Sequence, residues 1–138
     1  MKFILALDPG SEKVGFALVR FDLTVGEMGI VQLAELAATI ARLCTGPRPE
    51  AIVLGSGTHG KEIAERIAPH LPTDLPVYFG EEKNTTYEAR ARFFRDHPPT
   101  GWRRLLPLGM QIPPRPLDDY AAWLIGERYL VRHGLSGK

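Results

Sequence analysis

Acidic residues placed at the borders of apolar segments are the residues of this chain best suited to chemistry. Asp8 directly follows one apolar run, and Glu81 and Glu82 follow another. Asp118 and Asp119 begin a third segment, in which apolar residues recur at helical spacing. A charge beside a buried strand is unfavourable unless it is paired, so Asp8 in particular needs a partner.

Carboxylates gathered at one place would favour a divalent cation, because the ion relieves their mutual repulsion. Oxygen-only ligands, in a chain whose four histidines lack metal-ligand spacing, favour Mg²⁺ or Mn²⁺ over zinc. Two such ions activate a water and stabilise the leaving oxygen of a phosphodiester. Asp118 and Asp119 also have a simpler interpretation, as charges that offset a helix dipole. Glu81 and Glu82 would then be solvated turn residues.

Apolar spacing predicts the elements that would position these acids. Short apolar runs predict strands over 3–7, 15–20, 23–31, 51–54 and 76–79. Three- and four-residue spacing predicts helices over 33–44, 60–68, 85–96 and 117–132. Thr85 and Glu88 match a capping box for the third helix, and Pro116 is expected to open the last.

The order of these elements predicts an α/β fold in one domain over 1–138. Three antiparallel strands followed by strand–helix units give a five-stranded mixed sheet flanked by helices, the ribonuclease H-like arrangement. An actin-like ATPase shares this core but needs two copies, and 138 residues supply one. Because ligands gather at the carboxyl ends of parallel strands, the acids are expected to meet there.

Composition excludes several classes of protein. The net charge is only +1, so any affinity for nucleic acid must come from a local patch. The single cysteine, Cys44, excludes an intramolecular disulfide and fits a reducing cytoplasm. No apolar run approaches the ~20 residues of a membrane span, and Asp8 interrupts the first run too early for a signal peptide. We expect a cytoplasmic protein without a membrane partner.

A basic patch lies between Lys83 and Arg115. This stretch holds seven basic residues against two acidic ones, a local charge of +5. It overlaps residues 97–116, which hold six of the twelve prolines and form a long connection that is expected to be functional or mobile. Trp102 could stack on an unpaired base, although we favour a role in anchoring this connection to the core.

Three segments resemble the YqgF (RuvX) group, which is related to the RuvC Holliday junction resolvases. ILALDPGSEKVGFAL resembles the first-strand motif of both groups. VYFGEEKNTTYEAR resembles the segment written Asp-Glu-Arg-x-Thr/Ser-Thr-x-x-Ala/Glu-Ala, and LDDYAAWLIGERYL resembles the final-helix motif. The fourth predicted strand ends without the acid that RuvC proteins place there, which favours YqgF.

This resemblance implies particular site residues. The catalytic acids and metal ligands would be Asp8, Glu82 and Asp118, with Asp119 as an additional ligand and two Mg²⁺ or Mn²⁺ ions. Glu81 and Lys83 depart from the motif, since the family usually has aspartate and arginine there. The residues expected to bind nucleic acid are Lys13, Lys83, Thr86, Arg90, Trp102, Arg103, Arg104 and Arg115.

The function that the resemblance implies is a metal-dependent nuclease in the maturation of pre-16S ribosomal RNA. Resolution of branched DNA such as Holliday junctions is the alternative, and it implies a homodimer because two cuts are needed. A nucleic-acid-binding module with little catalysis is a further alternative, because the Asp-Glu-Arg motif is altered. A nucleotide-binding fragment related to sugar kinases is disfavoured by the missing second lobe.

Overall fold

The centre of the molecule is a five-stranded mixed sheet with the strand order β3-β2-β1-β4-β5. The computed structural model describes all residues from 1 to 138. The strands are β1 (Phe3–Pro9), β2 (Lys13–Arg20), β3 (Val25–Gln32), β4 (Ile52–Gly55) and β5 (Val77–Gly80). β1, β2 and β3 pair antiparallel, whereas β4 lies parallel to both β1 and β5. The predicted mixed sheet is confirmed.

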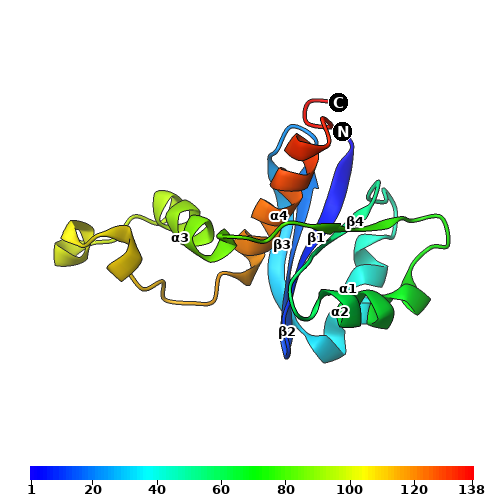
Figure 1. Cartoon of the computed structure of the whole chain (residues 1–138), viewed down its shortest axis with the longest axis horizontal. Helices are drawn as coiled ribbons and strands as arrows, with labels where there is room; N and C mark the ends of the chain where they lie inside the picture. The colour runs from blue at the N-terminus through cyan, green and yellow to red at the C-terminus, as the bar shows by residue number, and fades with distance from the viewer.

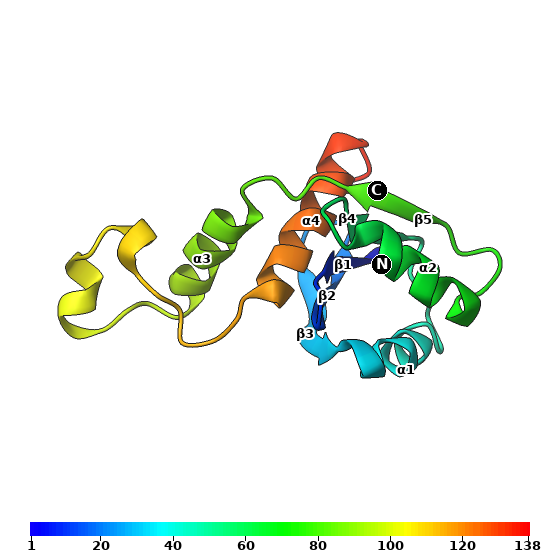
Figure 2. The ribbon, with the colours of Figure 1, turned by 60° about the horizontal axis from the view of Figure 1, so that its bottom comes forward.

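Helices cover the two faces of this sheet unequally. α1 (Leu33–Leu43) and α2 (Gly60–Ile67) pack on one face, and α4 (Asp118–Arg132) crosses the other (Figure 2). Side chains alternate along β1: Leu5 and Leu7 contribute to the cluster with α1 and α2, while Ile4 and Ala6 contribute to the cluster with α4. The same alternation places Asp8 on the face that α4 covers.

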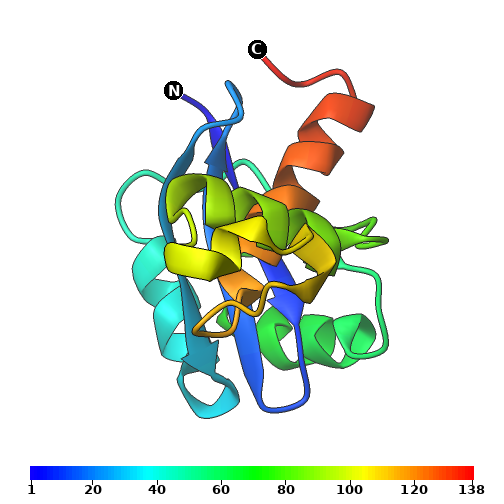
Figure 3. The same ribbon diagram turned by 90° about the vertical axis from the view of Figure 1, so that its left-hand side faces the viewer.

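The remaining helix, α3 (Thr85–Asp96), packs on α4 and extends away from the sheet (Figure 1). Ala89 and Phe93 of α3 form a small buried cluster with Tyr120 and Leu124 of α4. Residues 97–116 continue outward and then return to the start of α4, and they lie in front of the sheet when the molecule is viewed end-on (Figure 3). We refer to α3 together with residues 97–116 as the arm.

The predicted capping box is wrong. The residue before α3 is Asn84, which has a left-handed backbone (φ 62°) and makes no capping hydrogen bond through its side chain. Thr85 is instead the first helical residue, and its hydroxyl donates to the backbone oxygen of Glu82 (2.9 Å). Glu88 pairs with Arg128 of α4 (2.8 Å) rather than with the helix start. Tertiary contacts therefore replace the local cap.

Other differences concern the ends of elements. The third strand begins at Val25, because Leu23 occupies a turn with a positive φ of 74°. Asp118 is the first residue of α4, so Pro116 lies two residues before the helix and does not open it. The long connection is not without structure, since Gly101–Leu105 and Leu108–Met110 form short 3₁₀ helices.

The expectation that Trp102 anchors the connection to the core is also wrong. Its side chain is 68% exposed, and it lies in the first 3₁₀ helix of the connection. The residue that joins the arm to α4 is Phe93, which is 5% exposed. No helix of the structure has both the length and the apolar character needed to cross a membrane.

Candidate active site

Asp8 lies near the end of β1, opposite Gly15 of β2. The start of α4 rests directly on Gly15: a Cβ at this position would lie 2.8 Å from the Cβ of Asp118 and would overlap with its backbone carbonyl. Only glycine therefore lets α4 come this close to the sheet. The contact brings Asp118 next to the strand position that faces Asp8.

Glu82 reaches the other side of Asp8 from the turn after β5. Leu7 pairs with Leu54, so the residues that follow them, Asp8 and Gly55, lie side by side at the ends of parallel strands. A Cβ on Gly55 would lie 3.2 Å from the carboxyl carbon of Glu82, and one on Gly57 only 2.8 Å from it. These glycines therefore form the surface on which the Glu82 carboxylate rests.

The three carboxylates interact electrostatically. The pKa of Asp8 is raised from 3.8 to about 7, chiefly by burial and then by the negative charges of Asp118 and Glu82, in that order of importance. A cation also lies close by, because Nζ of Lys13 is 3.6 Å from Oδ2 of Asp118. Lys13 is thus beside the acids, as the sequence predicted, and it faces Asp118.

A cavity of about 360 Å³ opens over these acids. Its lining includes Asp8, Glu82 and Asp118 on the sheet side and Thr86, Arg90 and Arg115 on the arm side. Arg90 is held in place because its Nη1 donates to the backbone oxygen of Gly109 (3.2 Å). Its Nε is buried without a hydrogen-bond partner. The cavity therefore combines anionic and cationic walls.

The donor set of the cavity fits a divalent ion chemically. Asp8, Glu82 and Asp118 contribute carboxylate oxygens, and burial together with the charges of Asp118 and Glu82 raises the pKa of Asp8 to about 7. In this conformation, however, no group of three or more acidic, histidine or cysteine side chains converges closely enough to hold one ion. Asp8, Glu82 and Asp118, the acids that line the cavity, are the residues that would hold Mg²⁺ or Mn²⁺.

Solved structures with a similar fold cover the whole chain. RuvC of Thermus thermophilus in complex with a Holliday junction substrate superimposes with a TM-score of 0.58 and 16% identity, over 99% of this chain and 98% of that one. A second structure of Thermus thermophilus RuvC superimposes with a TM-score of 0.56 and 16% identity, over 99% of this chain and 97% of that one. The chain has a ribonuclease H-like fold. No family model matches the sequence, and no curated protein matches it either.

Within this ribonuclease H-like fold, Asp119 differs from its neighbour Asp118. It is 5% exposed, and its Oδ1 accepts hydrogen bonds from Arg115 (3.1 Å) and from the amide of Tyr120 (2.9 Å). It is absent from the lining of the carboxylate cavity. The structure therefore gives this carboxylate a role in holding Arg115, and its assignment as a metal ligand stays a prediction.

The remaining predicted site residues lie elsewhere. Glu81 pairs with Arg132 (3.7 Å), and Lys83 is exposed outside the carboxylate cavity. Trp102 and Arg103 line a second cavity on the arm, while Arg104 lines neither of the two. The fold thus brings together the three acids with Lys13, Thr86, Arg90 and Arg115, and separates the others from them.

Gly55 and Gly57, which support Glu82, are functional residues that sequence motifs alone did not reveal. The signal that could have found them is the glycine-rich stretch GSGTHG directly after the central parallel strand. Such a stretch at a strand end often marks a close approach of another group to the backbone. Here that group is a carboxylate of the same chain.

Proposed function

We propose that the chain is a metal-dependent nuclease. The observation that carries the proposal is the cavity in which acids from β1, α4 and the turn after β5 face Arg90 and Arg115. Phosphodiester hydrolysis needs both components, since the substrate is an anion that carboxylates alone would repel. A divalent ion held by the acids would polarise the phosphate and stabilise the charge that develops on it.

The side chains of the chain itself would position the substrate. Arg90 and Arg115 supply guanidinium groups, which match the geometry of phosphate oxygens better than lysine does. Asp119 fixes Arg115 through the 3.1 Å hydrogen bond, so this guanidinium is oriented before substrate arrives. Lys13, beside Asp118, supplies a positive charge for a neighbouring phosphate of the nucleic-acid backbone.

A four-way DNA junction is the substrate to test first. The likeness to RuvC extends over almost the whole of both chains, and that protein was solved with a Holliday junction. Resolution of a junction needs two cuts, so this function requires two copies of the site and predicts a homodimer. Maturation of pre-16S ribosomal RNA, which the resemblance to the YqgF group implies, stays a prediction that the same assay can test.

The test is a cleavage assay with labelled four-way junction, duplex DNA and single-stranded RNA carrying a pre-16S end. Each substrate is incubated with Mg²⁺, Mn²⁺ or chelator, using the wild type, Asp8→Asn and the control Glu35→Gln. Glu35 is an exposed acid on α1, on the opposite face of the sheet. We expect cleavage that needs metal and Asp8 but not Glu35.

Two results would overturn the proposal. Cleavage that persists in chelator and in Asp8→Asn would mean that another activity is present. Tight binding of every substrate without cleavage would favour a nucleic-acid-binding module instead. Sedimentation of the protein with and without junction tests the homodimer separately.

A further inference from the structure

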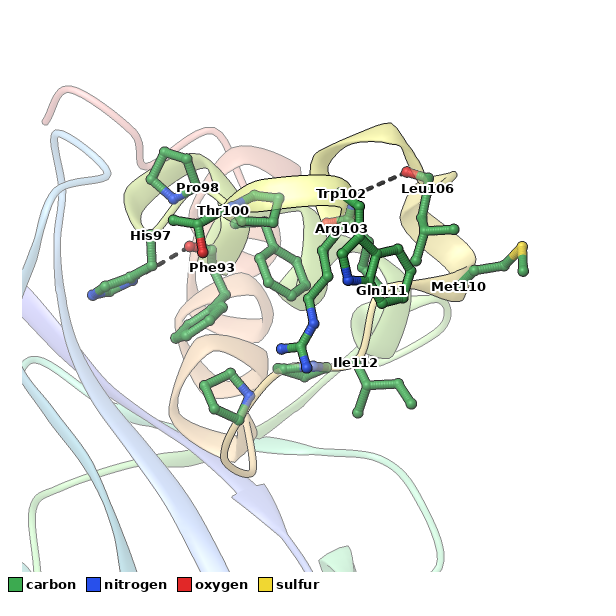
Figure 4. Close-up of a pocket in the computed structure, with 14 residues that line it drawn as sticks. Phe93, His97, Pro98, Thr100, Trp102, Arg103, Leu106, Met110, Gln111 and Ile112 are labelled. Carbon is green, nitrogen blue, oxygen red and sulfur yellow. Dashed lines mark hydrogen bonds between the residues drawn. The ribbon is translucent and has the colours of Figure 1, made fainter.

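The arm contains a second and larger cavity, of about 650 Å³, that is separate from the acids (Figure 4). It lies between the end of α3 and the segment that returns to α4. Trp102 and Arg103 come from the first 3₁₀ helix, and Met110, Gln111 and Ile112 come from the returning segment. In Figure 4 the side chain of Arg103 extends across the cavity toward Ile112.

The lining suits a flat, partly polar ring. Trp102 (68% exposed) offers an aromatic face, and Arg103 adds a guanidinium that can stack on a ring. Nε2 of Gln111 donates to the backbone oxygen of Leu106 (2.9 Å), which fixes the orientation of the amide. Its Oε1 is buried without a hydrogen-bond partner, so a donor from a ligand would relieve the cost of leaving this oxygen unpaired.

The arm cavity adjoins the cavity over the acids. Pro113 lines both, and the hydrogen bond from Arg90 to Gly109 links the wall of one to the segment that forms the other. The arm also carries arginines that form no ion pair, namely Arg90, Arg95, Arg103 and Arg104, whereas Arg92 is bound to Glu127. These free charges complement a polyanion that passes from one cavity to the next.

We propose that the arm cavity binds one unpaired base of the nucleic acid whose backbone crosses the acids. This inference rests on the proposed function, and it narrows the substrate class to DNA or RNA with an unpaired nucleotide near the cut. A paired base presents only its edges, so it cannot insert between Trp102 and Gln111. Insertion of a free base stacks it on Trp102 and offers its hydrogen-bonding edge to Oε1 of Gln111.

Binding in chelator tests the proposal without any cleavage. The probes are a duplex, the same duplex with one unpaired 2-aminopurine, and the RNA versions of both. We expect the unpaired probe to bind about tenfold more tightly than the duplex, with quenching of the 2-aminopurine by stacking. Trp102→Ala should remove this preference, a loss of about tenfold on the unpaired probe and less than twofold on the duplex.

Two matched controls separate the cavity from general effects. Leu105 is also exposed on the arm (80%) but does not line the cavity, so Leu105→Ala should leave the preference unchanged. Arg103→Ala and Arg104→Ala remove the same charge, but only Arg103 lines the cavity. Both substitutions should lower the affinity for the duplex probe equally. Arg103→Ala alone should also reduce the preference for the unpaired base.

The proposal is overturned if the unpaired probe binds no more tightly than the duplex, or if Trp102→Ala weakens both equally. Equal effects of Leu105→Ala and Trp102→Ala would instead indicate an apolar surface for a protein partner. Because no step uses metal or Asp8, these outcomes are independent of the cleavage assay. A retained preference without cleavage on any substrate would refute the nuclease and leave the base-binding cavity standing.

Discussion

The sheet and the arm contribute different residues to the candidate site and hold them in different ways. The acids lie at or against the edge of the sheet: Asp8 lies near the end of β1, Glu82 rests on glycines 55 and 57, and Asp118 is brought to the sheet by the contact of α4 with Gly15. The cations lie mainly on the arm, where a few hydrogen bonds hold them, such as those of Arg90 to Gly109 and Arg115 to Asp119. The acids are therefore positioned by the packed core, whereas most of the cations lie on the arm that is attached to this core.

This difference follows from what each group needs. Carboxylates that are to share a cation must be forced together against their repulsion, and only a packed core can do so. Guanidinium groups that meet a long, flexible polyanion need less precise placement, so an extended segment is sufficient. The arm touches the core chiefly through the small cluster around Phe93 and Tyr120.

The largest expected effect comes from removing an acid of the cavity. Asp8→Asn, Glu82→Gln and Asp118→Asn should each reduce cleavage at least about a thousandfold, since a metal ion contributes several kcal/mol to the transition state and each 1.4 kcal/mol is tenfold. Asp119→Asn should reduce cleavage less than Asp118→Asn, because it acts through Arg115. Initial rates at saturating Mn²⁺ measure this, and equal losses at 118 and 119 would make Asp119 a ligand.

A glycine on the sheet should matter far more than one on the arm. Gly15→Ala forces a Cβ into the start of α4, so the free energy of unfolding should fall by about 3 kcal/mol. Gly109→Ala meets nothing within 4 Å and should change the free energy of unfolding by less than about 0.5 kcal/mol. Urea unfolding followed by circular dichroism compares the two variants. Equal losses would mean that the arm is packed as tightly as the core.

Arg90 tests the link between the two regions. Arg90→Ala removes a cation from the cavity and the hydrogen bond to Gly109, so cleavage should fall about 10- to 100-fold with little change in melting temperature. Arg95→Ala removes an exposed arginine of the same helix that lines neither cavity, and it should cost less than threefold. Arg90→Lys should recover only part of the activity, because lysine keeps the charge but lacks the planar guanidinium that can donate to two phosphate oxygens.

The smallest effect is a dependence of stability on pH. The pKa of Asp8 is raised from 3.8 to about 7 in the folded chain, so the folded state favours the protonated carboxyl. The free energy of unfolding is therefore highest below about pH 4 and falls as the pH rises to about 7. In chelator, Asp8→Asn should therefore be more stable than the wild type at pH 8, by about 2 kcal/mol, and lose this advantage toward pH 4. This figure is below the full conversion of the shift because Asp8 is not completely buried.

Asp22→Asn is the control for this measurement. Hydrogen bonds from Thr24 lower the pKa of Asp22, so its contribution to stability has the opposite sign and is gained as the pH rises. Unfolding in urea at several pH values measures both variants. An advantage of Asp8→Asn that stays constant with pH would show that the pKa of Asp8 is not raised in the folded chain.

The sequence predicted the strands, the helices and the five-stranded mixed sheet from local features and from the order of the elements. Apolar runs such as Phe3–Leu7 can only be buried strands, and the element order leaves few topologies. The sequence showed acids at element ends, and the resemblance to the YqgF group selected Asp8, Glu82 and Asp118 among them. The start of α3 was mispredicted because its first turn is fixed by Glu82 and Arg128, which the local motif does not include.

The sequence by itself therefore determined which residues can do chemistry and which elements carry them. Only the tertiary structure decided which of these residues meet. It separated Asp118 from Asp119, placed Arg90 but not Lys83 over the acids, and turned Trp102 outward to line a cavity of its own. The reason is physical: side-chain type is a local property, whereas distance, burial and charge coupling depend on packing between segments far apart in the chain.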